Sequence, residues 1–179
     1  MDECGISMDV TVNRKYGKSY TDIRVKEEGP YQRGEKWTLL LAICGEDAEE
    51  GRDSRRWASV WLDGGTTVTR FLEFVQEILD AIGPATNDSF FVFTMDNLNS
   101  HRNHAVIALI HLYGHGVVFH APYWPVDGPI EFIFNTVQTL IRARLYQITS
   151  PEDLVQAIYQ SVASIDSFAS YFINCRFIL

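Results

Sequence analysis

Three carboxylates in this 179-residue sequence stand where a metal-dependent site can form. Asp2 lies at the start of the chain, Asp96 follows a run of apolar residues, and Glu131 follows a stretch rich in proline. Carboxylates held together repel one another, so such a group needs cations. Oxygen ligands suit Mg²⁺ or Mn²⁺ better than zinc, and two such ions about 3.5–4 Å apart can hydrolyse a phosphodiester. Asp2, Asp96 and Glu131 are therefore the candidate catalytic and metal-binding residues.

The stretch from residue 120 to 131 (HAPYWPVDGPIE) positions the third carboxylate. Its first prolines end an apolar run, and Asp127 is the predicted N-cap of a helix. Pro129 fits the first turn, where its missing N–H costs little. Glu131 is then expected in the first turn. The alternative is that Glu131 only complements the helix dipole.

Spacings of four and three residues predict one apolar face and one polar stripe on the helix that follows. The expected apolar residues are Ile130, Phe134, Val137, Ile141 and Leu145, and the expected polar stripe is Glu131, Asn135, Gln138 and Arg142.

The other predicted elements are strands and helices of ordinary length. Alternating residues 6–12 and apolar runs at 37–44 and 57–62 predict an antiparallel meander. A helix with Phe71, Val75, Ile78 and Ile82 on its core face ends at Gly83-Pro84. A fully buried strand at 90–95 follows. The next helix is capped by Asn99 or Ser100 and runs through Ala105, Leu109 and Leu112 to Gly114, and a strand at 117–119 comes after it. A last helix begins with a capping box at Ser150.

This order, β-β-β-α-β-α-β-α-α, is typical of an α/β domain. A strand, a helix and a strand in series predict a right-handed parallel crossover. Asp2 meets Asp96 if the first strand lies beside the fourth. We therefore predict a five-stranded mixed sheet in the order 3-2-1-4-5, with helices on both faces. Neither a repeat nor a linker is visible, so residues 1–179 are expected to form one domain.

Two motifs resemble those of DDE-superfamily endonucleases, and more narrowly the catalytic domain of mariner-type transposases. The motifs are residues 94–101 (TMDNLNSH) and the stretch 120–131 described above. That family has an aspartate-asparagine pair with a nearby histidine, then proline-tyrosine-x-proline and proline-isoleucine-glutamate. The 34 residues between Asp96 and Glu131 resemble the spacing of one branch of the family. Asp2-Glu3 resembles its first catalytic aspartate and the glutamate after it.

The resemblance implies a ribonuclease H-like fold, two Mg²⁺ ions and cleavage of DNA at transposon ends followed by strand transfer. Asp2 would bridge the metals, and Asp96 and Glu131 would each hold one. Glu3, Asn97 and His101 are accessory candidates, and a homodimer is left open. The chain departs from the family at Asp127-Gly128, where asparagine-proline is usual, and at Gln138, where relatives often carry lysine.

The first strand is expected to be truncated, because only Met1 precedes Asp2. The helix-turn-helix region of such transposases is absent from this sequence as well. Chain ends fray unless they are paired, and the Met1 ammonium group would compete with a cation, so weak cleavage is expected. The alternative function is a catalytically inactive transposon remnant, or a domesticated domain that binds nucleic acid or protein.

The net charge of -8 argues against passive binding of nucleic acid, but basic residues gather between Arg14 and Lys36. The alternative is an ordinary solvated surface. Trp124 is either a core aromatic or a platform for an unpaired base. The DNA-binding candidates are Arg14, Lys15, Lys18, Arg33, Lys36, Trp124, Asn135, Gln138 and Arg142.

Other sequence features concern the cellular location of the protein and a possible zinc site. Three cysteines without metal spacing predict reduced thiols, and neither a signal peptide nor a membrane span is expected. The predicted location is nuclear if the host is a eukaryote and cytoplasmic otherwise. His111 and His115 have the i, i+4 spacing of zinc ligands but no partner residues, so surface or core roles are favoured for them.

Overall fold

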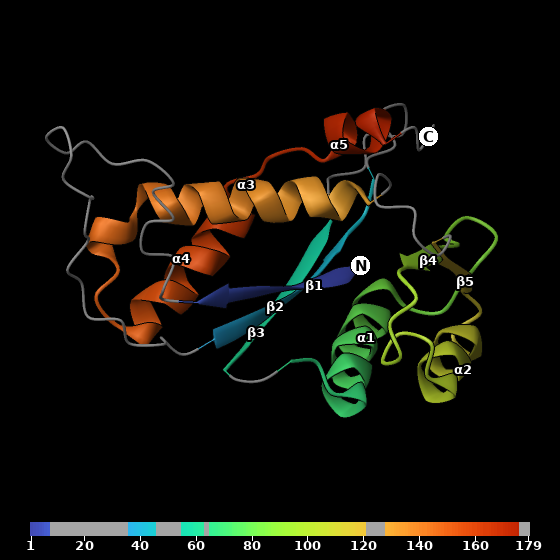
Figure 1. Ribbon diagram of the computed structural model, residues 1–179. Helices are drawn as coiled ribbons and strands as arrows, with labels where there is room; N and C mark the ends of the chain where they lie inside the picture. The colour runs from blue at the N-terminus through green and yellow to red at the C-terminus, as the bar shows by residue number, and fades with distance from the viewer. Residues whose placement is uncertain (8–35, 46–54, 63–64, 121–127, 176–179) are drawn as a thin grey trace, which may run out of the picture.

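The chain folds as an α/β domain in which strands form two sheets and helices cover both faces (Figure 1). This computed structural model describes residues 1–7, 36–45, 55–62, 65–120 and 128–175. The predicted order of elements is confirmed, and a short C-terminal helix is added that the sequence did not predict. The elements are β1 (Asp2–Ser7), β2 (Lys36–Ile43), β3 (Arg56–Leu62), α1 (Val68–Ile82), β4 (Val92–Met95), α2 (His104–Leu112), β5 (Gly116–Phe119), α3 (Pro129–Ala143), the 3₁₀ turn η1 (Leu145–Gln147), α4 (Pro151–Ala163) and α5 (Ala169–Asn174).

The strands pair as an antiparallel sheet β1-β2-β3 and a parallel pair β4-β5. Asp2 lies opposite Leu41, and Val92 lies opposite Gly116. Both halves of the predicted order are present, but among the described residues no ladder joins β1 to β4. A hydrogen bond from the Met1 ammonium group to the Thr94 carbonyl oxygen, at 2.8 Å, links the start of β1 to β4. The predicted single sheet in the order 3-2-1-4-5 therefore stays a prediction where β1 meets β4.

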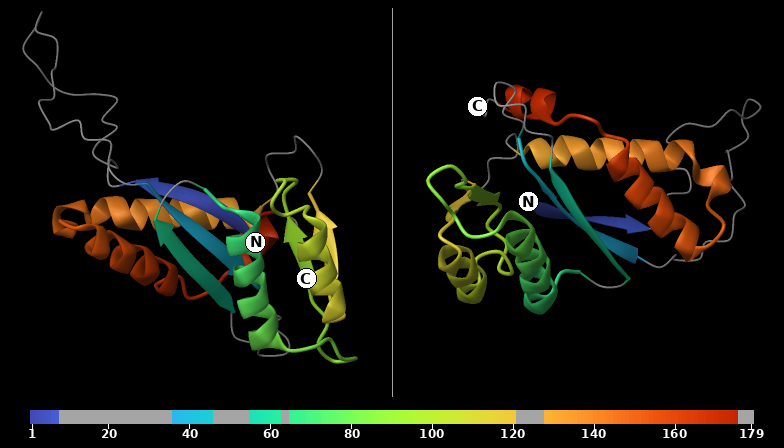
Figure 2. Two further views of the ribbon diagram at one scale, coloured as in Figure 1. Left: turned by 90° about the horizontal axis from the view of Figure 1, so that it is seen from below. Right: turned by 180° about the vertical axis from the view of Figure 1, so that it is seen from behind.

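The central strand β2 is buried on both faces, as its continuous apolar run predicts. Leu39 and Leu41 pack in a core with α3 and α4 on one side. Leu40 and Ala42 pack in a second core with α1, α2 and β4 on the other. Figure 2 shows the helices on either side of the three-stranded sheet.

Helix α1 has the predicted apolar face, with Phe71, Val75 and Ile78 buried, and it ends at Gly83. Gly83 has φ 77°, a conformation that glycine adopts without steric cost.

Helix α2 begins later than predicted. Its N-cap is Asn103, whose side-chain oxygen accepts the Ala105 N–H at 2.9 Å, and neither Asn99 nor Ser100 caps it. Val106 and Ile110 are its buried residues, and Leu112, its last residue, is 79% exposed. Five polar residues precede the helix, and burial of Ser100 and His101 leaves Asn103 as the cap.

Helix α3 begins with Pro129 in its first turn, as predicted, and buries Ile130, Phe134, Val137 and Ile141. Its N-cap is Gly128, one residue after the predicted Asp127, which lies outside the described residues. The helix ends at Ala143, before the predicted Leu145, which lies in η1. Helix α4 has the predicted capping box of Ser150 and Asp153.

Asp2 opens β1, as predicted, and residues 8–12 of the predicted alternation lie outside the described residues. The run at 90–95 was predicted to be fully buried, but Phe90 is 59% and Val92 51% exposed. None of the helices in the described ranges is long and apolar enough to cross a membrane.

Candidate metal centre

The three candidate carboxylates come from elements that meet at one end of the sheets. Asp2 opens β1, Asp96 directly follows β4, and Glu131 lies in the first turn of α3, as predicted. Figures 1 and 2 show the start of β1, the end of β4 and the start of α3 close together. Segments far apart in the sequence therefore carry acidic groups to one region.

The Asp2 carboxyl group is electrostatically coupled to both of the others. Burial raises its pKa to about 6, and the negative charges of Asp96 and Glu131 act in the same direction. The Glu3 N–H, which donates to Asp2 Oδ1 at 2.7 Å, and the Met1 ammonium group oppose the rise. A partly desolvated carboxylate that feels two further negative charges is suited to holding a cation.

The Met1 ammonium group lies beside this acidic cluster. Burial lowers its pKa to about 6, although the charges of Asp2 and Asp96 favour the protonated form. Its hydrogen bond to the Thr94 carbonyl oxygen fixes the start of β1 next to the last residues of β4.

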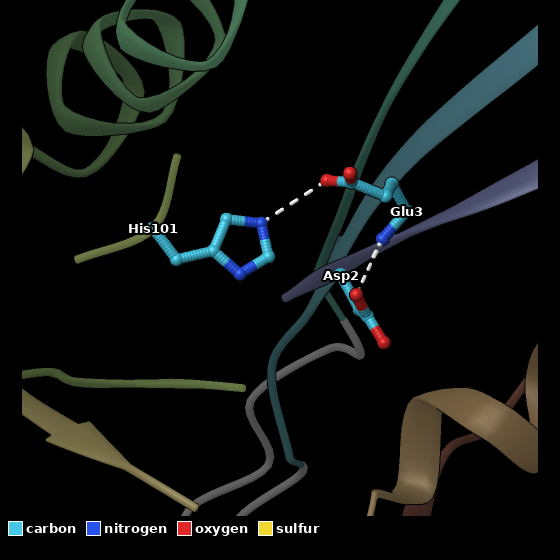
Figure 3. A group of neighbouring side chains, drawn as sticks. All are labelled: Asp2, Glu3 and His101. Atoms are coloured by element: carbon cyan, nitrogen blue, oxygen red, sulfur yellow. Dashed lines mark hydrogen bonds and ion pairs between the residues drawn. The ribbon is translucent and has the colours of Figure 1, made fainter. Parts of the chain in front are cut away.

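His101 links two carboxylates on the other side of β1. Its Nε2 lies 3.1 Å from Glu3 Oε2 and its Nδ1 lies 2.5 Å from Asp96 Oδ1 (Figure 3 draws the Glu3 contact). The ring is fully buried and packs on Phe71, with ring centroids 4.3 Å apart. Burial disfavours the charged ring, but the Glu3 hydrogen bond and the charges of Asp96 and Glu3 outweigh it and raise the pKa of His101. The carboxylates at both ring nitrogens favour the imidazolium form, which can donate from both.

The ligand atoms of Asp2, Glu3 and His101 lie within 4.8 Å of one another. Figure 3 shows Glu3 reaching toward His101 while the Asp2 carboxyl group turns away, because successive strand residues face opposite sides. Asp96 and Glu131 are not in this group, so the structure does not bring all three candidate carboxylates into one tight cluster. An imidazolium has no lone pair for a metal, so His101 in this state is a partner for carboxylates and not a ligand.

Asp96 is held by its neighbours through a single oxygen. Its Oδ1 faces His101 and also accepts the Leu98 N–H at 3.1 Å, so Oδ2 is the atom that a cation would use. Asn97 donates from its side-chain amide to the His120 carbonyl oxygen at 2.5 Å, which ties the residues after β4 to the end of β5. These hydrogen bonds of Asp96 and Asn97 fix the geometry of the segment that follows β4.

The described residues include four of the nine DNA-binding candidates. Arg14, Lys15, Lys18, Arg33 and Trp124 lie outside the described residues. Lys36 is exposed at the start of β2, where its side chain covers Gly5.

The polar stripe of α3 divides into exposed and partly buried positions. Gln138 donates to Cys4 Sγ at 3.1 Å and accepts from Arg142 at 3.2 Å, so it packs against β1. Asn135 and Arg142 are exposed.

His115 has a structural role in the core. Its Nδ1 accepts the Phe91 N–H at 3.4 Å, its Nε2 donates to the Gly83 carbonyl oxygen at 3.0 Å, and the residue is 3% exposed. His111 is exposed on α2. The core and surface roles favoured for these histidines are the roles that the structure gives them.

Two contacts of the site had no signal in the sequence. The first is the link between Met1 and Thr94, and the second is the stacking of Phe71 on His101. Phe71 was placed on the core face of its helix by its spacing, but nothing in the sequence paired it with a histidine.

A family model described as DDE superfamily endonuclease matches residues 1–151. No curated protein matches the chain.

Among solved structures, the chain is similar to the Mos1 transposase paired-end complex with left transposon end, with a TM-score of 0.66 and 21% identity over 97% of this chain and 49% of that one. The Mos1 mariner paired-end complex with Mn gives 0.65 and 19% identity, over 98% and 50%. The Mos1 transposase catalytic domain with Raltegravir and Mg gives 0.56 and 15% identity, over 79% and 69%. The chain thus has the ribonuclease H-like α/β fold of these domains and spans about half the length of the chains in the two complexes.

Proposed function

The chain belongs to the DDE superfamily of endonucleases, and we propose that it is a transposase catalytic domain that cleaves DNA strands and transfers them. Residues 1–179 act as one catalytic domain, the substrate is transposon-end DNA, and two copies act together on paired ends. The similar Mos1 complexes contain a left transposon end and paired ends, which supports this substrate and this assembly.

One observation carries the proposal: Asp2, at the start of β1, has a pKa raised to about 6 by burial and then by the charges of Asp96 and Glu131. Three segments far apart in the sequence therefore direct negative charge at one point. Burying a carboxyl group near two other negative charges costs folding free energy. A bound cation would offset this cost, whereas a binding domain without a cation would not.

We propose that Asp2, Asp96 and Glu131 hold two Mg²⁺ or Mn²⁺ ions, with Asp2 shared between them. Bound divalent ions would supply a nucleophilic water or hydroxyl and stabilise the leaving oxygen of the phosphodiester. The oxygen-only donor set fits these hard cations. Solved structures of Mos1 with Mn and with Mg support the choice of metal.

The remaining residues of the region act by positioning. His101 holds Asp96 and Glu3 in place through its two ring nitrogens, and Phe71 fixes the plane of the ring. Asn97 fixes the loop after β4 through the His120 carbonyl group. Asp96 and Glu131 remain accessible to a solvated ion, since Asp96 has a side-chain exposure of 46% and Glu131 is also exposed.

A non-catalytic domain that binds nucleic acid or protein is the second candidate. The salt bridges of His101 with Asp96 and Glu3 favour it, because they give both carboxylates a protein partner without a metal. The net charge of -8 favours it as well.

A nicking assay on supercoiled plasmid DNA separates the two functions. We expect nicking that requires Mn²⁺ or Mg²⁺ and that Glu131→Gln reduces more than the roughly 10–100-fold typical of losing an outer-shell partner of a metal. Glu152→Gln, an exposed glutamate in the first turn of α4, is the matched control and should nick normally. If the folded wild-type chain does not nick DNA at all with either metal, the second function is favoured. Nicking that survives Glu131→Gln would contradict the proposed site.

A further inference from the structure

Strand β3 lies at one edge of the β1-β2-β3 sheet (Figure 2), and within the described ranges no strand pairs with its outer side. Its ladder with β2 shows which backbone groups point outward. The Cys44 N–H donates to the Arg55 carbonyl oxygen at 2.8 Å, so these two residues form a hydrogen-bonded pair. Such pairs alternate along an antiparallel ladder. The residues whose N–H and carbonyl groups point to the open edge are therefore Arg56, Ala58, Val60 and Leu62.

A contact with α4 supports this direction independently. The Val60 N–H donates to the Tyr159 hydroxyl group at 3.3 Å, on the side away from β2. This hydrogen bond is long, and Tyr159 is 42% exposed, so the tyrosine side chain can move aside. The outer edge of β3 thus offers a row of backbone donors and acceptors to another strand.

The residues along this edge lack the features that usually prevent strand pairing. Natural edge strands are protected by charged residues, proline or bulges. After Arg56, β3 has the sequence WASVWL, which contains neither a charge nor a proline, and it pairs with β2 in an unbroken register. The exposed stripe of α4 beside it is also uncharged, and it consists of Gln156, Tyr159 and Ala163.

The lack of charge on this surface bears on the identity of the partner. The chain has a net charge of -8, so two copies repel one another unless they meet at an uncharged surface. The WASVWL segment and the uncharged stripe of α4 form such a surface. A strongly basic or acidic peptide finds no charge there to pair with, so the surface favours a second copy of this chain.

We propose that two copies of the chain associate through β3, as antiparallel strands related by a two-fold axis at Ser59. In this register all 7 residues of β3 have a partner. Ala58 lies opposite Val60 of the second copy, and Arg56 lies opposite Leu62. These residues exchange ladder hydrogen bonds, because their backbone groups all point outward. Ser59 lies opposite Ser59 of the second copy.

The side chains match across the axis in the same register. Trp57 of each copy lies opposite Trp61 of the other, on the face of the sheet that α1 covers, and aromatic pairs stabilise neighbouring strands. The small Ser59 between them leaves room for the indole rings. On the other face, Ala58 pairs with the larger Val60. The pattern is therefore self-complementary, as a two-fold interface requires.

The test places charges at the two-fold axis. Ser59→Lys and Ser59→Asp each set two like charges directly opposite one another, so each variant alone should associate about 10-fold or more weakly than the wild type. An equimolar mixture should recover association, because lysine then faces aspartate. Ser170→Lys and Ser170→Asp, on the exposed surface of α5, are the matched controls and should associate like the wild type.

Sedimentation velocity without DNA measures the association. We expect a wild-type Kd of about 10–100 µM, because one strand pair and one helix stripe make a small interface. Hydrogen exchange locates the contact, since the amides of Ala58 and Leu62 should exchange more slowly at high protein concentration. If the Ser59 variants do not fold, Leu62→Lys replaces them and sets a lysine opposite Arg56 of the second copy. Its control is Leu112→Lys, and the two leucines are 42% and 79% exposed.

A wild-type chain that stays monomeric at roughly 1 mM would overturn the proposal, even if its β3 amides are protected, because another part of the chain would then cover the edge. A dimer that the charged variants leave intact would also overturn it, since the interface would lie elsewhere. So would charged variants whose mixture stays monomeric. The readouts are association and exchange without DNA, so the result does not depend on whether the chain cleaves DNA.

Discussion

At the scale of single residues, His101 makes more contacts with acidic side chains than its place in the sequence suggests. It is fully buried, and its contact with Glu3 spans 98 positions of sequence. The motif places a histidine five residues after Asp96, which gives one of its contacts. The contact with Glu3 was not predictable, because it depends on how closely β1 approaches the loop after β4.

Replacing His101 with leucine should destabilise the chain by roughly 1–3 kcal/mol, because Glu3 and Asp96 lose their common donor in a partly buried site. Urea unfolding measures the free energy of unfolding. His104→Leu is the matched control, since His104 is an exposed residue at the start of α2. Equal losses for both variants would show that His101 contributes no more than a surface histidine.

At the scale of elements, the sequence predicted a helix correctly where one capping residue or one apolar spacing stood out from its neighbours. α1 and α3 have the predicted apolar faces, and α4 has the predicted capping box. α2 was placed too early, because the five polar residues 99–103 all precede it and only tertiary burial decides among them. The short helix α5 carries no periodic signal and was not predicted.

Arg56 joins β3 to the end of α4 in a way that the sequence did not indicate. Its Nη1 lies 2.7 Å from the Val162 carbonyl oxygen and also contacts the carbonyl oxygens of Ala163 and Ile165. Its guanidinium lies 5.1 Å from the centre of the Phe168 ring. Arg56 therefore caps the last carbonyl groups of α4 with a cationic side chain.

The Arg56→Met variant should lose about 1.5–3 kcal/mol of unfolding free energy, the range for hydrogen bonds made by charged groups. The neighbouring Arg55 is exposed, so Arg55→Met should stay within about 0.5 kcal/mol of the wild type. Urea unfolding of the two variants in one buffer makes the comparison. A smaller loss at Arg56 than at Arg55 would contradict the capping role.

The capping box of α4 predicts a pH dependence. The Thr149 N–H, the Thr149 hydroxyl and the Ser150 N–H donate to Asp153 and lower its pKa below the ordinary 3.8. A lowered pKa stabilises the fold above 3.8, and the stabilisation is lost as the pH falls through the folded-state pKa. Asp153→Asn should therefore lower the Tm at pH 7, and the two melting curves should converge near pH 3. A Tm difference that stays constant down to pH 3 would contradict this assignment.

At the scale of the whole molecule, the sequence predicted the α/β class, helices on both faces, and the family. It did not predict the hydrogen bond between Met1 and Thr94 that links the two sheets, nor the cavity next to it. Strand order follows from chain order and handedness rules, whereas ladder continuity depends on how far two staggered strands overlap. The same junction holds Asp2, so the stability of the sheet and the position of the candidate site are coupled.

The central claim is that Asp2, Asp96 and Glu131 together hold divalent cations. The most direct measurement is anomalous diffraction from crystals of the chain grown with Mn²⁺. We expect manganese peaks bound by Asp2 and Asp96 on one side and by Asp2 and Glu131 on the other, and no peaks in crystals of Asp96→Asn and Glu131→Gln combined. Manganese bound instead by Asp2, Glu3 and His101, or no manganese near β1 in the wild-type crystals, would contradict the claim.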